Sequence, residues 1–219
     1  MIIAIDGPAG AGKGTLSRSL AAYLGYPYLD TGTLYRAAAL YLIKNGGALD
    51  DPTVIKATVE SVAVDIIDDD NLRTSEIALA SSKIAKIPAV REALLEFQQK
   101  FAHRSPGAIL DGRDVTTVIA PEADVKLFVT ALLEVRALRR HQELLDRDQV
   151  SIYAKVLAEI KARDEQDKHR ISAPMRKADD AIEIDTSDLK PLDVFRIALT
   201  VISEVAKGKF SMPKLLINK

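Results

Sequence analysis

The sequence predicts an α/β fold in which a parallel sheet forms the core and helices flank it. Short apolar segments alternate along the chain with longer segments of helical periodicity, which is typical of strands joined by helical crossovers. The first apolar segment leads directly into a glycine-rich loop that ends in lysine and threonine, GPAGAGKGT. These two observations indicate a phosphate-binding site at one edge of the sheet.

Five short segments have the composition of buried strands: residues 2–5, 26–29, 108–110, 125–129 and 181–184. Polar residues follow each of the last four, as in DTG after the second and DGRD after the third. Ligands of open parallel sheets bind beyond the carboxyl ends of the strands. We therefore expect these polar clusters to gather with the glycine-rich loop around one crevice.

The phosphate loop, as we call residues 7–15, joins the first strand to a helix expected over residues 13–24. The residues expected to bind ATP are Gly7, Pro8, Ala9, Gly10, Ala11, Gly12, Lys13, Gly14 and Thr15. Lys13 suits the β- and γ-phosphates, and Thr15 suits a magnesium ion. The residue after Lys13 is Gly14 rather than a hydroxyl residue, a GKGT ending that is typical of small nucleotide kinases. The alternative is a turn that merely connects strand and helix.

Composition narrows the class of protein. The chain has 219 residues, 30 basic and 31 acidic side chains and no cysteine. Balanced charge provides no field to attract nucleic acid or an anionic membrane. The absence of cysteine excludes disulfides and thiolate chemistry, and no apolar run approaches the roughly 18 residues of a membrane span. We expect a cytoplasmic monomer that acts on small molecules.

Two long segments interrupt the alternation of strands and helices. Residues 33–103 are mainly helical by pattern and would form a lobe that holds the phosphate acceptor. Residues 134–177 contain seven of the chain's fourteen arginines, which suits a lid that closes over ATP, although an arginine-rich surface held by ion pairs is the alternative. The single domain of residues 1–219 would thus have a core (1–32, 104–133 and 178–207), two attached parts and a mobile tail, 208–219.

Six sequence motifs, taken in order, resemble those of bacterial cytidylate kinases. They are IDGPAGAGKGT, LDTGTLYRA, RTSEIALASSKIAKIPAVR, LDGRDVTTVIAPEADVKLFVTA, RDEQDKHRISAPM and DTS, and the resemblance covers residues 2 to about 206. The resemblance implies the P-loop nucleoside monophosphate kinase fold, with an acceptor lobe and a helical lid. It also implies transfer of the ATP γ-phosphate to CMP or dCMP, with Mg²⁺ as cofactor.

The resemblance also assigns the residues that bind CMP. Arg36, Arg113 and Arg170 would hold the acceptor phosphate, and Thr31, Arg163 and Asp167 the sugar. Ser82, Arg91 and Asp114 would read the base, because cytosine offers an amino donor beside two acceptors and uracil replaces the amino group with an oxygen. Taken singly, Arg163 and Asp167 could form a surface ion pair, Ser82 could fill a helix and Asp114 could cap a turn.

Catalysis would rest on cations, since an ionised phosphate acceptor needs no strong base. The expected catalytic residues are Lys13, Arg113, Arg170, Arg139 and Arg140. Asp111 could help to hold Mg²⁺ through water, beside Thr15, or could instead form a salt bridge to Arg113. The three histidines are expected to have no role in catalysis or in metal binding.

Two features depart from the family pattern. The acceptor-lobe insert, residues 59–72, is short, and Thr116 stands where a glycine is expected. Two other functions stay open: a kinase of another small acceptor such as AMP, UMP or shikimate, and a nucleotide-hydrolysing switch that binds a protein partner.

Overall fold

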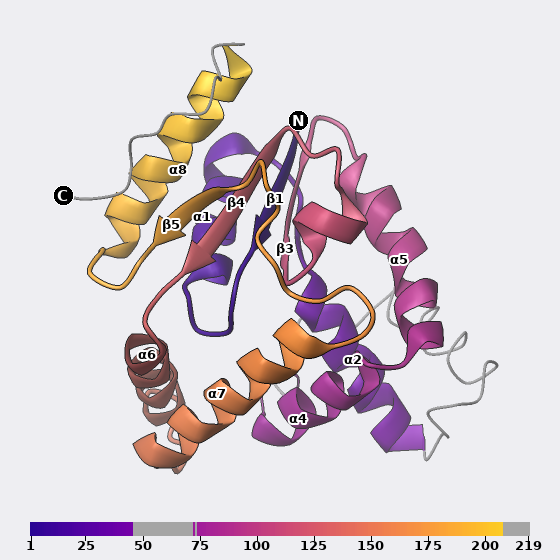
Figure 1. The fold of residues 1–219 in the computed structure, drawn as a ribbon, viewed down its shortest axis with the longest axis vertical. Helices are drawn as coiled ribbons and strands as arrows, with labels where there is room; N and C mark the ends of the chain where they lie inside the picture. The colour runs from indigo at the N-terminus through magenta and orange to yellow at the C-terminus, as the bar shows by residue number, and fades with distance from the viewer. Residues whose placement is uncertain (46–71, 73, 208–219) are drawn as a thin grey trace.

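A computed structural model describes residues 1–45, 72 and 74–207 of the chain (Figure 1). The tail expected to be mobile, 208–219, and the acceptor-lobe insert apart from Leu72 lie outside the described residues.

Five parallel strands form one sheet in the order β2-β3-β1-β4-β5. The strands are β1 (Ile2–Asp6), β2 (Tyr28–Asp30), β3 (Ala108–Gly112), β4 (Val125–Thr130) and β5 (Ile182–Asp185). All five expected strands are therefore present, and the α/β class is confirmed. β2 begins after Pro27 rather than at Tyr26, and a proline has no N–H to donate to a neighbouring strand.

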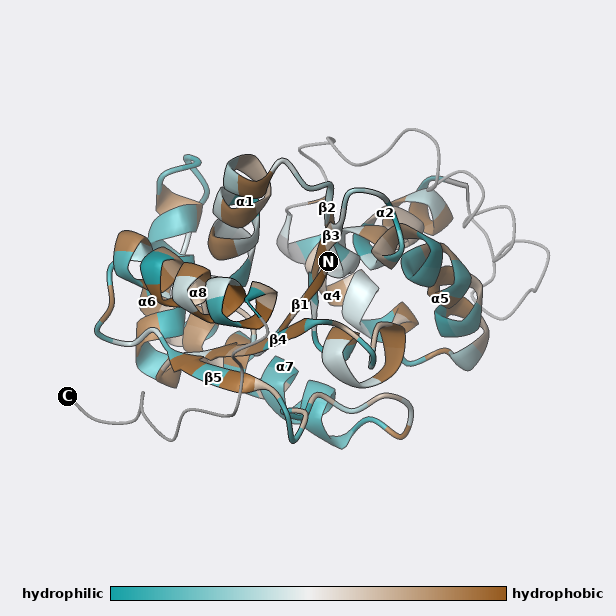
Figure 2. Cartoon of the chain, turned by 90° about the horizontal axis from the view of Figure 1, so that it is seen from above, coloured by the Kyte–Doolittle hydropathy of each residue, from teal (hydrophilic) through white to brown (hydrophobic). Residues whose placement is uncertain are grey.

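Helices cover both faces of this sheet (Figure 2). On one face, α1 (Lys13–Leu24) and α8 (Pro191–Ala206) pack on strand residues such as Ile3, Ile5 and Leu127. On the other, α2 (Thr31–Asn45), α4 (Ser75–Ile84) and α5 (Pro88–Ala102) share a core with Ala4 and Leu110. Alternate residues of β1 thus enter different cores, as the two-residue period of a strand requires. In its described part, the segment 33–103 is helical, as expected.

The arginine-rich segment forms two helices, α6 (Leu133–Leu145) and α7 (Tyr153–His169). They pack on one another through a small core of their own, formed by Ala137, Leu144, Val156 and Ile160. Figure 1 shows this pair beyond the carboxyl ends of the strands, on the side of the phosphate loop. No described helix combines the length and the apolar composition that a membrane span requires.

Candidate active site

The phosphate loop connects β1 to α1 at the carboxyl edge of the sheet. Gly7 has φ 144°, and a Cβ there would lie 1.9 Å from the carbonyl oxygen of Val129 on the neighbouring strand. Only glycine fits this approach, so the packing of the loop on β4 fixes the residue type. The loop and its helix thus have the strand-to-helix context that phosphate binding requires.

Lys13 is buried at the start of α1, and its Nζ donates to the carbonyl oxygen of Pro8 at 2.9 Å. Burial and, after it, the charge of Arg113 together lower the pKa of Lys13 to about 7, although the carboxylates of Asp111 and Asp30 act in the opposite direction. An ammonium group with a lowered pKa is poised to gain stability from an incoming anion.

Two carboxylates lie beside Lys13, at the ends of β2 and β3. Asp111 accepts a hydrogen bond from the Tyr28 hydroxyl at 2.7 Å. Burial, followed by the charge of Asp30, raises the pKa of Asp111 to about 6. Hard oxygen donors that repel one another in a buried site suit a divalent cation, so these residues fit Mg²⁺. Arg113, the alternative partner for Asp111, instead donates from Nε to Asp167 at 3.0 Å.

Each arginine expected to hold the acceptor phosphate contacts a carboxylate. Arg36 Nη2 lies 2.5 Å from Asp30 Oδ2. Arg113 pairs with Asp167 of α7, and Arg170 Nη2 lies 3.2 Å from Asp114 Oδ1. Three elements thus present guanidinium groups to the same region, each already oriented by an acid.

The expected sugar-binding residues adjoin these arginines. The Thr31 hydroxyl donates to the Asp111 carbonyl oxygen at 2.8 Å, which fixes the first residue of α2 against β3. Arg163 Nε lies 4.0 Å from Asp167 Oδ2 one helical turn away. Burial and, after it, the charge of Arg113 together lower the pKa of Arg163 to about 10. Asp167 is buried and Arg163 is half-buried, so this pair lies beside Arg113 and is only partly open to solvent.

Two of the three expected base readers meet directly. Arg91 donates to Asp114, and the Arg91 guanidinium carbon lies 5.8 Å from the centre of the Tyr35 ring. Arg91 and Tyr35 also line a cavity of about 260 Å³ with Gln98. Ser82 does not meet them through any hydrogen bond of its hydroxyl among the described residues; its carbonyl oxygen accepts from Gln166 of α7 at 2.9 Å.

The expected lid arginines differ in their contacts. Arg139 donates from both terminal nitrogens to Thr186, at 2.9 Å to the hydroxyl and 2.6 Å to the carbonyl oxygen. Thr186 in turn donates to the Ala11 carbonyl oxygen of the phosphate loop at 3.0 Å. Arg140 lies 2.9 Å from Glu143 on the same helix. Arg139 is therefore near the phosphate loop, whereas Arg140 pairs with Glu143 within α6.

Sequence reasoning missed several residues of this region. Asp30 orients Arg36, Tyr28 contacts Asp111, and Arg136 contacts both the phosphate loop and Asp164 of α7. Asp30 begins the DTG cluster that was expected in the crevice, but its contact with Arg36 was not predicted. Nothing in the local sequence distinguished Arg136 from its neighbours.

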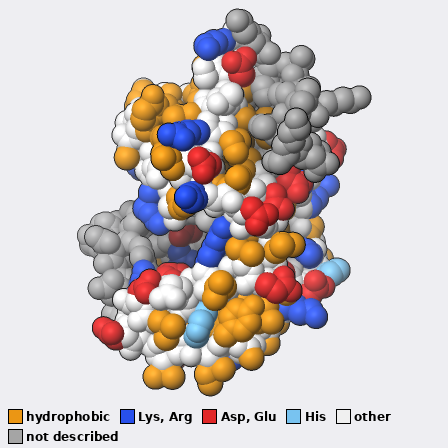
Figure 3. Space-filling view, turned by 90° about the vertical axis from the view of Figure 1, so that its left-hand side faces the viewer, with side chains coloured by type: hydrophobic (Ala, Val, Ile, Leu, Met, Phe, Trp, Pro, Cys, Tyr) orange, Lys and Arg blue, Asp and Glu red, His pale blue; other side chains and the backbone are white. Residues whose placement is uncertain are grey.

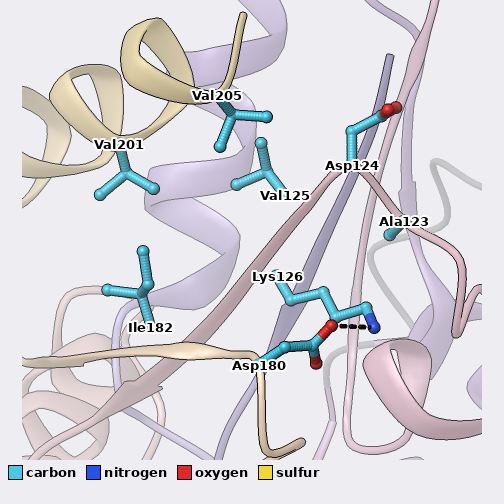
Figure 4. A pocket seen from close by; sticks show the side chains of 8 residues that line it. All are labelled: Ala123, Asp124, Val125, Lys126, Asp180, Ile182, Val201 and Val205. Atoms are coloured by element: carbon cyan, nitrogen blue, oxygen red, sulfur yellow. Dashed lines mark hydrogen bonds and ion pairs between the residues drawn. The ribbon is translucent and has the colours of Figure 1, made fainter. Parts of the chain in front are cut away.

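The histidines contact nearby groups: His103 the Gln99 carbonyl oxygen, His141 the Ser151 hydroxyl and His169 the Glu165 carbonyl oxygen. In the part of the chain that the structure describes, no three acids, histidines or cysteines are grouped so that they could together hold a metal ion. A second cavity, of about 120 Å³, lies by Lys126 and Asp180, which pair at 2.6 Å (Figure 4). It is lined by Val125 and Ile182, the first residues of β4 and β5, and so lies at the opposite end of the strands from the phosphate loop.

Comparison with known proteins identifies the family. The cytidylate kinase family model matches residues 3–204. The cytidylate kinase of Xanthobacter autotrophicus is 48% identical over 209 residues, which are 95% of this chain and 100% of the relative. That of Paramagnetospirillum magneticum is 50% identical over 204 residues, 92% and 97% of the two chains. A crystal structure of an uncharacterized protein from Eubacterium ventriosum shares the fold, with a TM-score of 0.51, 15% identity and coverage of 93% and 98%. The phosphate loop suits ATP, and the arginines suit a second phosphate. The family model and these relatives show that the chain belongs to the cytidylate kinase family of ATP-dependent phosphotransferases.

Proposed function

We propose that the chain performs its family's reaction, transfer of the ATP γ-phosphate to CMP or dCMP, in the crevice at the carboxyl ends of the strands. The observation that carries this assignment is the position of Arg113. Its charge lowers the pKa of Lys13 in the donor loop, and its Nε donates to Asp167 on the acceptor side. One guanidinium between the two phosphate sites is the arrangement that transfer requires.

On the donor side, residues 7–15 would surround the ATP phosphates with backbone N–H groups, and Lys13 would contact the β- and γ-phosphates. Thr15 and Asp111 would hold Mg²⁺, with Asp111 acting through water. When bound, the ion would neutralise charge on the phosphates and help to align them. Lys13 would exchange its bond to Pro8 for one to phosphate.

On the acceptor side, Arg36, Arg113 and Arg170 would hold the phosphate of CMP. Their carboxylate partners keep the guanidinium groups oriented, so little conformational entropy is lost when the phosphate binds. Arg163, Asp167 and Thr31 would contact the sugar.

The base would be read by Asp114, Arg91 and Ser82. Asp114 is a buried acceptor that suits the cytosine amino group, and Arg91 is a donor that suits the ring acceptors. Uracil would place an oxygen against the carboxylate and lose affinity.

Residues 33–103 would act as the acceptor lobe and 134–177 as the lid, with Arg139 and Arg140 reaching the transferred phosphate on closure. The Arg139 bonds to Thr186 hold that side chain beside the donor loop. We further infer a cytoplasmic monomer that acts on small molecules. Balanced charge argues against nucleic acid and anionic membranes as partners, and basic and acidic side chains intermingle on the face shown in Figure 3.

The decisive experiment measures ADP formation from Mg-ATP with CMP, dCMP, UMP, AMP or no acceptor. We expect rapid turnover with CMP and dCMP alone. Preference for UMP or AMP would retain the kinase and refute the roles of Ser82, Arg91 and Asp114. ADP formation without an acceptor would favour the nucleotide-hydrolysing switch.

A further inference from the structure

Arg136 lies where three parts of the molecule meet, and each of its guanidinium nitrogens contacts a different one. Nε donates to the Ala131 carbonyl oxygen beyond β4 at 2.8 Å. Nη1 donates to the Ala9 carbonyl oxygen of the phosphate loop at 3.1 Å. Nη2 lies 2.7 Å from Asp164 Oδ2 on α7. Arg136 and Asp164 are each only 6% exposed, so water weakens these contacts little.

The backbone of Arg136 also packs on the phosphate loop. A Cβ on Gly10 would come within 3.0 Å of the Arg136 carbonyl oxygen, so the start of α6 lies directly against the turn of the loop. The side chain and backbone of one residue therefore both contact the segment expected to hold ATP.

Asp164 connects this arrangement to the acceptor side. It shares α7 with Arg163 and Asp167, and Asp167 accepts from Arg113 at 3.0 Å. Ala9, Arg136, α7 and Arg113 therefore form a continuous path from the donor loop to the acceptor arginines.

We propose that Arg136 is a positioning residue of the reaction: through Asp164 it fixes the phosphate loop relative to α7, and so sets the distance between donor and acceptor phosphates. The three separate nitrogens of arginine let Arg136 reach partners on three different elements at once, whereas the three donors of lysine all radiate from one atom. Phosphoryl transfer depends on alignment, and a displacement of about 1 Å can slow an enzymatic step roughly a hundredfold. A buried ion pair usually adds little net stability compared with apolar side chains of similar size. Stability alone therefore gives little reason for an Arg136–Asp164 pair at this position.

This inference rests on the proposed function and predicts a loss of turnover rather than of binding. The test compares kcat and both KM values for the wild type, Asp164→Asn and the control Glu159→Gln. Asp164 Oδ1 has no hydrogen-bond partner in the described structure, so an amide nitrogen can take its place while the other oxygen still accepts from Arg136. Glu159→Gln makes the same change on α7 in an exposed pair with Lys155 at 4.0 Å.

We expect Asp164→Asn to lower kcat about tenfold, because the ion pair becomes a weaker hydrogen bond from Arg136 to a neutral acceptor. Each KM should stay within about twofold of the wild type. The control should keep wild-type kinetics. Arg136→Lys should lower kcat in the same way. If Asp164→Asn fails to fold, the kinetics of Arg136→Lys test the proposal in its place.

The outcomes separate the two proposals. An inactive wild type would overturn the proposed function. An active wild type with Asp164→Asn equal to Glu159→Gln, or with the loss confined to KM, would overturn this inference alone. Failure of both Asp164→Asn and Arg136→Lys to fold would assign the pair a structural role and overturn the inference as well.

Discussion

Arg91 donates a hydrogen bond to the carboxylate of Asp114, and both side chains are buried. Arg170 contacts the other oxygen of the same carboxylate. Asp114 is thus held between two guanidinium groups, which fix its orientation. A fixed hydrogen-bond acceptor is what discrimination between an amino group and a carbonyl oxygen requires.

Asp114→Asn should relax the choice of base. An amide can donate to the uracil oxygen, so the repulsion that excludes UMP disappears. We expect the ratio of kcat/KM for CMP to that for UMP to fall about 10- to 100-fold, because a buried polar mismatch costs about 1–3 kcal/mol. The exposed residue Asp179 offers a control, Asp179→Asn, that should keep the wild-type ratio. An unchanged ratio in Asp114→Asn would show that another residue reads the base.

Arg36→Ala should weaken binding of the acceptor and leave that of the donor intact. The Arg36 guanidinium lies between Asp30, at 2.5 Å, and the Thr33 hydroxyl, at 2.6 Å, on the acceptor side. Loss of a charged hydrogen bond of about 1.5–3 kcal/mol should raise the KM for CMP about 10- to 100-fold. The KM for ATP should stay within about twofold. Arg196→Ala removes an exposed arginine of α8 and serves as the control. An equal loss of ATP affinity in Arg36→Ala would contradict the assignment.

Much of the fold could be predicted because its signals are local. An apolar run before a glycine-rich turn identifies β1 and the phosphate loop, and the Gly7 contact with Val129 explains why the turn needs glycine. The boundaries of β2 were less predictable. Its start after Pro27 depends on pairing with β3, which is 80 residues away in sequence.

The contacts within the candidate site could not be predicted in this way. Arg136, Arg139 and Arg140 lie within five residues of one another, yet they contact α7, Thr186 and Glu143 respectively. The packing of α6 against other elements decides which arginine turns inward, and the spacing along one helix does not reveal it. Likewise, Arg113 donates a hydrogen bond to Asp167, which is 54 residues away in the sequence, and not to Asp111, which is only two residues away.

The protein should take up a proton when it binds ATP at pH 8. The folded, ligand-free protein has a Lys13 pKa of about 7, lowered from 10.5 chiefly by burial, so Lys13 is mostly neutral at pH 8. Phosphate oxygens favour the ammonium form and raise this pKa, so Lys13 gains a proton on binding at pH 8 and almost none at pH 6. Calorimetry with a non-hydrolysable ATP analogue in two buffers of different ionisation enthalpy measures the uptake.

Lys13→Met is the control for this prediction, because it removes the titrating group and should abolish the buffer dependence at pH 8. A wild-type binding enthalpy that is the same in both buffers at pH 8 would contradict the lowered pKa or the contact with phosphate.

Thr116→Val should destabilise the fold. Asp6, at the end of β1, is fully buried, and Thr116 donates to its carboxylate from the backbone N–H at 2.8 Å and from the hydroxyl at 2.6 Å. Valine keeps the shape and the N–H but removes the hydroxyl donor, so denaturation should show a loss of about 1–3 kcal/mol.

The loss should also depend on pH. Burial raises the pKa of Asp6, and the Thr116 hydroxyl acts in the opposite direction by stabilising the charged form. Removing the hydroxyl therefore raises this pKa further, and the cost should grow as pH rises through it, because only the ionised carboxylate needs the donor. The control is Thr117→Val, since the Thr117 hydroxyl lies 3.5 Å from the Asp114 carbonyl oxygen and contributes little. Equal stability of the two variants would show that the backbone donors suffice for Asp6, and that the threonine found where a glycine was expected has no stabilising role.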